Sequence, residues 1–160
     1  MNTQFEEALA LRKAKQYEAS RTILTTMLEE EALKAKAHLQ IAWSYDNEGK
    51  EREAVAHYEA ALKGPISENE RFDAVFGLAS TLRSLGNYHE ALKYFEQTKH
   101  DFPDLIEVQP FHAMCLHNLG RHQEAMAMLL ELLLQTTSST QIQAYQRAIR
   151  LYAENLDKQW

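Results

Sequence analysis

The sequence is poor in the residues that build disulfides, tight turns and secretion signals. Among its 160 residues there are one cysteine, Cys115, three prolines and five glycines. One cysteine forms no disulfide within the chain, and the first residues, MNTQFEEALA, lack the basic and apolar blocks of a secretory signal. The most apolar run, AMAMLLELLL, is too short for a bilayer and is interrupted by Glu131. We therefore expect a cytoplasmic protein without a membrane partner.

Basic residues are also scarce. The chain has 17 lysines and arginines against 23 acidic residues, which gives a net charge of −6. Because a protein that binds a phosphate backbone needs a basic groove or stripe, nucleic acid is excluded as a partner. Hydrophobic residues are plentiful, at 45% of the total, and they suffice for one domain with a substantial core.

The hydrophobic residues recur in a repeat. Gly49, Gly86 and Gly120 mark three copies and Lys15 a weaker first one, with spacings of 34 (15 to 49), 37 (49 to 86) and 34 (86 to 120). Apolar residues recur every three or four positions on both sides of each marker, which is typical of two helices joined by a turn. Small residues seven positions before and five after each marker let the two helices approach closely. They are Ala8, Ala42, Ala79 and Ala113 before the markers, and Ser20, Ala54, Ala91 and Ala125 after them.

This pattern resembles the tetratricopeptide repeat, a helical hairpin of about 34 residues that reads W-x2-L-G-x2-Y, then A-x3-F, A and P. The stretch from Phe72 to Pro103 fits it best. The order of the last two copies is also similar to a small bacterial group of short repeat proteins without assigned activity. The resemblance implies an all-α, right-handed superhelical stack of nine helices in one domain. Its expected parts are repeats at about 1–34, 35–68, 69–105 and 106–137, and a capping helix at 139–157.

One boundary stays open at this stage. Between Tyr17 and Glu48 there is neither glycine nor proline. The register of the repeat places a turn near Glu30 to Ala35, and the alternative is one continuous helix.

In the family that the sequence resembles, the first helix of each hairpin lines a concave groove for a peptide or a partner helix. By register, Trp43, Phe76 and Met114 are apolar anchors in such a groove, although packing between neighbouring helices explains Trp43 and Phe76 equally well. Phe5 and Leu9 stand where some relatives have the Lys and Asn that clamp a terminal carboxylate, so a ligand of that kind is not expected. The groove residues expected are Lys36, Leu39, Trp43, Asp46, Asn47, Phe76, Ser80, Arg83, Met114, His117 and Asn118.

Candidate metal ligands and nucleophiles gather near the third glycine marker. His112, Cys115, His117 and His122 are spread around one helix and a loop, whereas zinc needs ligands that converge at about 2.0–2.3 Å. Cys115 and His112 suggest a nucleophile and a base, but a helix interior offers neither a strained turn nor an oxyanion donor. We expect surface histidines and a buried cysteine, with no metal, no cofactor and no catalytic activity.

The segment from Glu124 to Gln135 is apolar around its whole circumference, so it must be buried on all sides. We expect one face to pack on the preceding helix and an outer strip to pair with itself in a homodimer. The alternative is that the terminal helix and Trp160 cover this strip. The inner face comprises Leu129, Leu132 and Leu133, and the self-association strip comprises Met126, Leu130 and Leu134.

Two functions are compatible with these observations. The first is a non-catalytic protein–protein interaction module or scaffold that self-associates. The alternative is a receptor whose concave groove binds a peptide. In both, the partner is a protein or a peptide.

Overall fold

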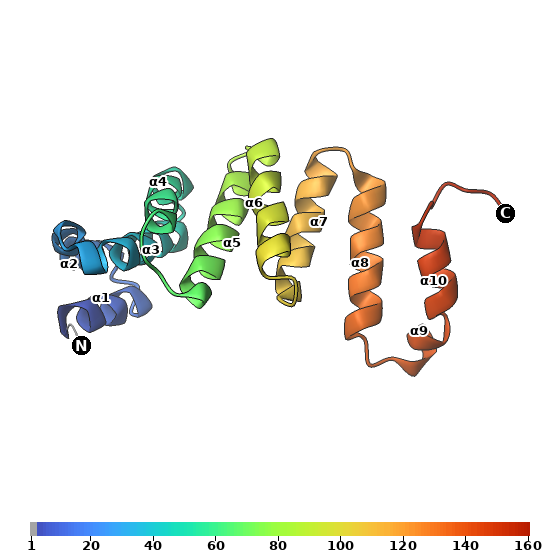
Figure 1. Ribbon diagram of the computed structural model, residues 1–160, viewed down its shortest axis with the longest axis horizontal. Helices are drawn as coiled ribbons and strands as arrows, with labels where there is room; N and C mark the ends of the chain where they lie inside the picture. Colours follow the sequence, from blue (N-terminus) through green and yellow to red (C-terminus); the bar gives the residue numbers. More distant parts are fainter. Residues whose placement is uncertain (1–2) are drawn as a thin grey trace. The chain divides into compact units, whose positions relative to one another are not determined.

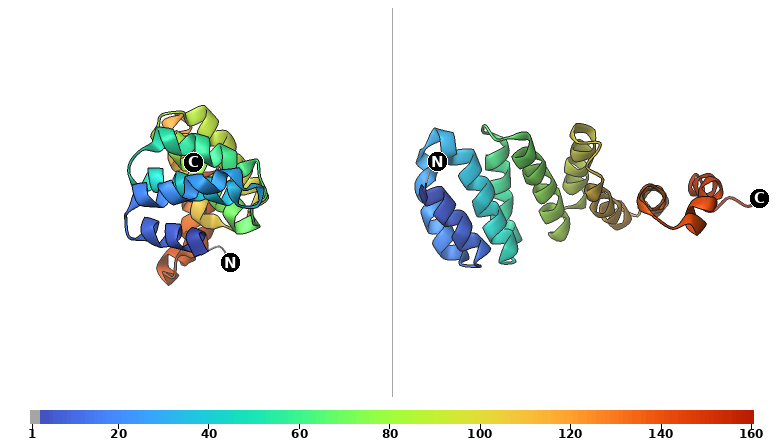
Figure 2. Two further views of the ribbon diagram at one scale, coloured as in Figure 1. Left: turned by 90° about the vertical axis from the view of Figure 1, so that its left-hand side faces the viewer. Right: turned by 90° about the horizontal axis from the view of Figure 1, so that it is seen from below.

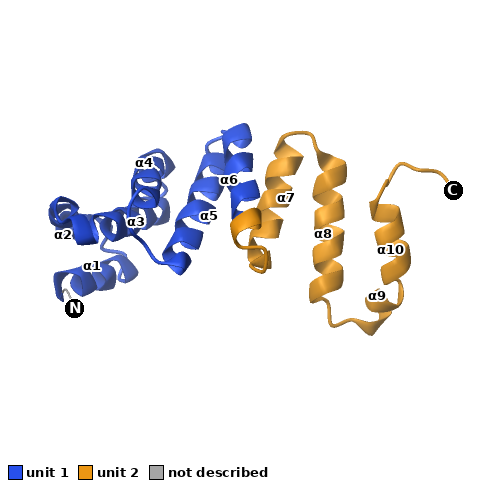
Figure 3. Ribbon diagram, in the orientation of Figure 1, with its two compact units in different colours: residues 1–98 blue, residues 99–160 orange. Residues whose placement is uncertain are grey.

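The computed structural model describes residues 3–160. Helices and connecting turns make up this range, and no strand occurs in it, which confirms the predicted all-α fold. The chain divides into two compact units, residues 1–98 and residues 99–160 (Figure 3).

The first unit is built of helical hairpins (Figure 1). Consecutive helices from α1 to α5 lie side by side (Figure 2), which is the sequential arrangement that the repeat predicts. Only the last residues of α6, 99–101, fall in the second unit. The helices are α1 (Thr3–Lys13), α2 (Tyr17–Thr26), α3 (Glu31–Asn47), α4 (Glu51–Leu62), α5 (Glu68–Ser84) and α6 (Tyr88–Asp101).

A turn residue with positive φ lies at each of the four sequence markers. Gly49, Gly86 and Gly120 have φ angles of 75°, 83° and 75°, in the left-handed region that glycine adopts without steric cost. Lys15 has a φ of 62° and occupies the same place in the first hairpin. The weaker copy therefore makes the same turn with a residue that is strained in it.

The open boundary between the first two copies is a turn. A short 3-10 helix, η1 (Met27–Glu29), follows α2, and Glu30 is extended at φ −94° and ψ 107° before α3 begins. Leu24 and Met27 are buried in one cluster with Ile41. Because no glycine or proline breaks the helix here, we attribute the bend to this packing.

A capping box and a proline in the first turn explain two other helix starts. The hydroxyl of Ser67 accepts from the Glu70 amide at 3.3 Å, and the Glu70 carboxylate accepts from the Ser67 amide at 2.8 Å, which is a capping box at the start of α5. Pro110 lies in the first turn of its helix, where a missing amide proton costs no hydrogen bond.

The second unit corrects the predicted ninth helix. The chain leaves helical geometry at Tyr145 and the last helix ends at Ala153, so residues 3–160 contain ten α-helices. Gln143 donates to the carbonyl of Thr137, whereas Arg150 pairs with Glu131, so the two halves are held by different neighbours. The elements are η2 (Ile106–Val108), α7 (Gln109–Asn118), α8 (His122–Thr136), α9 (Thr140–Ala144) and α10 (Gln146–Ala153).

Candidate functional site

The predicted groove residues of the first unit lie on α3 and α5. Leu39 must be removed from the set, because it is fully buried and has no surface for a partner. The helix that carries it packs against α1, α2, α4 and α5, which leaves little of α3 uncovered. Asn47 is exposed, and six other residues of the set are partly exposed: Lys36, Trp43, Asp46, Phe76, Ser80 and Arg83.

Asp46 is committed to contacts within the fold. Its carboxylate accepts from the Tyr58 hydroxyl at 2.5 Å and from the Thr81 hydroxyl at 3.0 and 3.1 Å. Burial raises the pKa of the Asp46 carboxyl above its usual range, although both hydrogen bonds act to lower it. A Cβ on Gly77 would lie 2.7 Å from the Tyr58 ring, so a glycine is needed to admit that ring. Asp46 thus joins α3, α4 and α5.

Trp43 lies beside Arg12, which was not among the predicted groove residues. The guanidinium of Arg12 sits 5.1 Å from the centroid of the indole ring and donates to the side chain of Gln40 at 3.1 Å. A sequence signal for Arg12 was present, since it lies three residues before Lys15, as Asp46 lies three before Gly49.

Arg83 carries an unsatisfied hydrogen-bond donor. Its Nε is buried and has no hydrogen-bond partner within residues 3–160. A buried donor without an acceptor typically costs about 1–3 kcal/mol. An acceptor supplied by a bound molecule would remove that cost.

The groove residues of the second unit are accessible. Met114, His117 and Asn118 on α7 are all exposed, and Phe111 on the same helix is exposed as well. Phe111 was missed because the register assigned it to no partner.

Among the described residues, the large hydrophobic side chains that are exposed all belong to the second unit. Within residues 3–160, every large hydrophobic residue with an exposed side chain lies at or beyond position 105. They are Leu105, Phe111, Met114, Met126, Leu129, Leu133, Tyr145, Leu151, Tyr152, Leu156 and Trp160.

The outward face of α8 differs from the prediction. Leu134 is buried at 9% exposure and Leu130 is half-buried, whereas Met126, Leu129 and Leu133 are 40–47% exposed. Leu130 and Leu134 follow Gln123 by seven and eleven residues and so share its face of the helix. That face meets the C-terminal segment, since Gln123 accepts from the Leu156 amide and donates to the Ala153 carbonyl. The predicted inner and outer leucines are thus largely exchanged.

The structure argues against Cys115 as a nucleophile, because this cysteine is fully buried. His112 is buried too, and burial, followed by the positive charges of Lys99 and Arg121, lowers its pKa to about 4. Within residues 3–160, no group of three or more His, Cys, Asp or Glu side chains is placed to hold a metal ion. In the same range no helix is both long and apolar enough to cross a bilayer.

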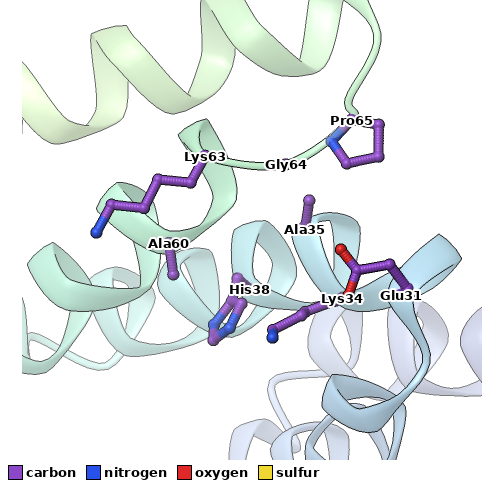
Figure 4. Close-up of a pocket in the computed structure, with 8 residues that line it drawn as sticks. All are labelled: Glu31, Lys34, Ala35, His38, Ala60, Lys63, Gly64 and Pro65. Atoms are coloured by element: carbon purple, nitrogen blue, oxygen red, sulfur yellow. The ribbon is translucent and has the colours of Figure 1, made fainter.

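A surface pocket of about 220 Å³ opens between α3 and the end of α4 in the first unit (Figure 4). Gly64 lies against α3 here, since a Cβ on it would come within 2.6 Å of the Ala35 methyl group. Nδ1 of His38 is 2.9 Å from Nδ1 of His57 on α4, and burial lowers the pKa of both imidazoles. The lining residues are Glu31, Lys34, Ala35, His38, Ala60, Lys63, Gly64 and Pro65.

Comparison with known proteins identifies similar repeats. The family model described as "Tetratrico peptide repeat" matches residues 35–156. The crystal structure of YrrB, titled a TPR protein with an unusual peptide-binding site, is 21% identical with a TM-score of 0.74, covering 96% of this chain and 78% of YrrB. No curated protein matches the chain.

Two further solved structures are similar in fold. A mutant of MamA is 17% identical with a TM-score of 0.65, covering 96% of this chain and 95% of MamA. A putative kinesin light chain with nearly identical TPR-like repeats from Podospora anserina is 20% identical with a TM-score of 0.67, covering 96% and 90% of the two chains. At such identities the likeness concerns the fold alone.

Proposed function

Because this chain belongs to the tetratricopeptide repeat family, whose members generally bind proteins or peptides, we propose that it is a non-catalytic interaction module that self-associates through its second unit. The observation that carries the proposal is the distribution of large exposed hydrophobic residues, which are absent from the first unit within residues 3–98 and numerous in the second. Clustered apolar surface of this kind usually marks an interface.

The proposed interface is centred on the exposed hydrophobic residues of α8. Met126, Leu129 and Leu133 are spaced by three and four residues, so they form one ridge on the helix. Full burial of a leucine or methionine contributes about 1.5–3 kcal/mol. In a twofold dimer both chains bury this ridge, so its contribution to the free energy of association is doubled.

The oligomeric state tests this proposal. We expect light scattering after size exclusion to give about twice the chain mass of 18.5 kDa at micromolar concentration. Leu129→Glu combined with Leu133→Glu should give a folded monomer, because burying two added charges per chain is prohibitive. Thr22→Glu with Thr25→Glu, which adds the same charge to an exposed face of α2, is the matched control and should stay dimeric. A wild-type mass near 18.5 kDa throughout would refute self-association.

The second candidate function is a peptide receptor that uses the inner face of the first unit. It is favoured by the unsatisfied Nε of Arg83 and by the partly exposed Trp43 on the neighbouring hairpin. Both are features that a bound peptide would use, through an acceptor for the guanidinium and an apolar side chain for the indole.

Replacement of one tryptophan tests the receptor. Peptides selected from a random library against the intact chain should lose about 2 kcal/mol or more of binding free energy in Trp43→Ala. Trp160→Ala removes an exposed tryptophan from the second unit and should leave that affinity unchanged. Equal affinity of wild type and Trp43→Ala, with normal melting of both, would rule out this groove.

A further inference from the structure

Two histidines face each other across the turn between α7 and α8. His117 lies in the last turn of α7 and His122 is the first residue of α8, and both side chains are exposed. Their Nδ1 atoms are 3.0 Å apart. The sequence spacing concealed this contact, because positions five apart are far from one another on a continuous helix but here belong to two helices.

The turn fixes the separation of the two helix ends. The Gly120 amide donates to the carbonyl of His117 at 3.0 Å, and the Arg121 amide donates to the carbonyl of Leu116 at 2.9 Å. Gly120 takes the left-handed conformation that closes the helix. The two imidazoles are therefore carried by a backbone that is already ordered, so little entropy remains to be lost when they share a ligand.

The rings are oriented differently from those of the other histidine pair. His38 and His57 have a shorter Nδ1 separation, 2.9 Å, but a longer distance between ring centroids, 5.1 Å, as expected when the nitrogens point at one another in a hydrogen bond. For His117 and His122 the centroids are only 4.7 Å apart at a nitrogen separation of 3.0 Å. In the pair of His117 and His122, the two Nδ1 atoms therefore do not lie on the line between the ring centroids, and the hydrogen bond between them is less linear.

We propose that His117 and His122 form a two-histidine site for a late first-row divalent cation of the Cu²⁺ or Ni²⁺ type. An ion at about 2.0–2.1 Å from both Nδ1 atoms would see them at an angle of roughly 90°, which is the angle between neighbouring ligands in tetragonal geometry. When the ion binds, the proton on the donor Nδ1 moves, by exchange with water, to Nε2 of the same ring, since a metal-bound imidazole nitrogen carries no proton and the neutral ring keeps one N–H. Water completes the coordination, because no third protein ligand is placed there within residues 3–160.

The surrounding charges permit a cation. Arg121, the nearest basic residue in the sequence, is paired with Glu124 through contacts of 2.6 and 2.9 Å. This pairing offsets the repulsion that an isolated guanidinium would exert on a metal ion. The chain as a whole is acidic, with a net charge of −6.

Calorimetric titration of the untagged chain with Cu²⁺, and separately with Ni²⁺, tests the site at neutral pH. We expect His117→Gln and His122→Gln each to weaken binding by about tenfold or more, because loss even of groups that only support metal ligands costs about 10–100-fold. His89→Gln removes an exposed histidine that belongs to neither of the two histidine pairs and should bind as wild type does. The ion should also raise the melting temperature of wild type and of His89→Gln by more than that of the two site variants.

Three results would overturn the proposal. The first is wild-type binding no tighter than that of His117→Gln or His122→Gln. The second is binding that survives both variants and is lost in His57→Gln, which would assign the ion to the other pair. The third is equal weakening by His89→Gln, which would indicate only scattered surface contacts.

Discussion

Asp46 was predicted as a groove residue, but its carboxylate makes hydrogen bonds within the fold instead. It accepts from Tyr58 and Thr81, so three helices depend on it. We expect Tyr58→Phe to lower the free energy of unfolding by about 1–3 kcal/mol, because the half-buried carboxylate loses a donor that nothing replaces. Urea denaturation followed by circular dichroism measures this, and Tyr145→Phe, at an exposed tyrosine, should change little. Equal urea midpoints for Tyr58→Phe and Tyr145→Phe would contradict a stabilising hydrogen bond between Tyr58 and Asp46.

The buried His112 makes the free energy of unfolding depend on pH. Burial lowers its pKa to about 4, against about 6.5 in an unfolded chain, so the folded state binds fewer protons between these values. Its contribution is present above pH 6.5 and is lost as pH falls toward 4, with a total on the order of 3 kcal/mol at most. Nuclear magnetic resonance of the His112 ring should show a midpoint near pH 4. A midpoint near 6.5 in the folded protein would be inconsistent with its burial.

At the scale of the element, the first hairpin turn carries a strained residue. Lys15 has the positive φ that Gly49, Gly86 and Gly120 adopt freely. Since a side chain in this conformation costs about 1–2 kcal/mol, Lys15→Gly should raise the melting temperature by a few degrees. Gly49→Lys, the reverse change in the next hairpin, should lower it, although a Cβ there meets no atom within 4 Å. A melting temperature unchanged by both substitutions would show that the turns are not strained.

Elements also show where sequence reasoning succeeded and failed. Hairpin turns were predictable because their markers, from Lys15 to Gly120, impose local backbone geometry. The outward face of α8 was not, because an all-apolar helix has no polar side to orient it, and only the contacts of Gln123 with residues 153–156 decide which leucines are covered. The break at Tyr145 was hidden for a different reason, because apolar residues recur at helical spacing across it.

At the scale of the molecule, the repeat register predicted the helical hairpins but only part of the candidate site. A register assigns each position to a face of a helix, and it says nothing of which polar groups are already paired. Leu39 and Asp46 were therefore predicted as groove residues although one is buried and the other is bonded within the fold. Arg12 follows the same register and was omitted only because the first copy is weak.

The placement of the two tryptophans makes the chain its own optical probe. Trp43 lies partly covered under Arg12 in the first unit, and Trp160 is 68% exposed in the second. Since a covered indole emits at shorter wavelength than one in water, Trp160→Phe leaves Trp43 as its single fluorophore, and a red shift of this emission on heating reports the loss of structure in the first unit. Trp43→Phe leaves Trp160, which is already largely in water and should shift little. Comparison of the Trp43 emission with the circular dichroism of the whole chain then shows, without any attached dye, whether the two units lose structure together or in turn.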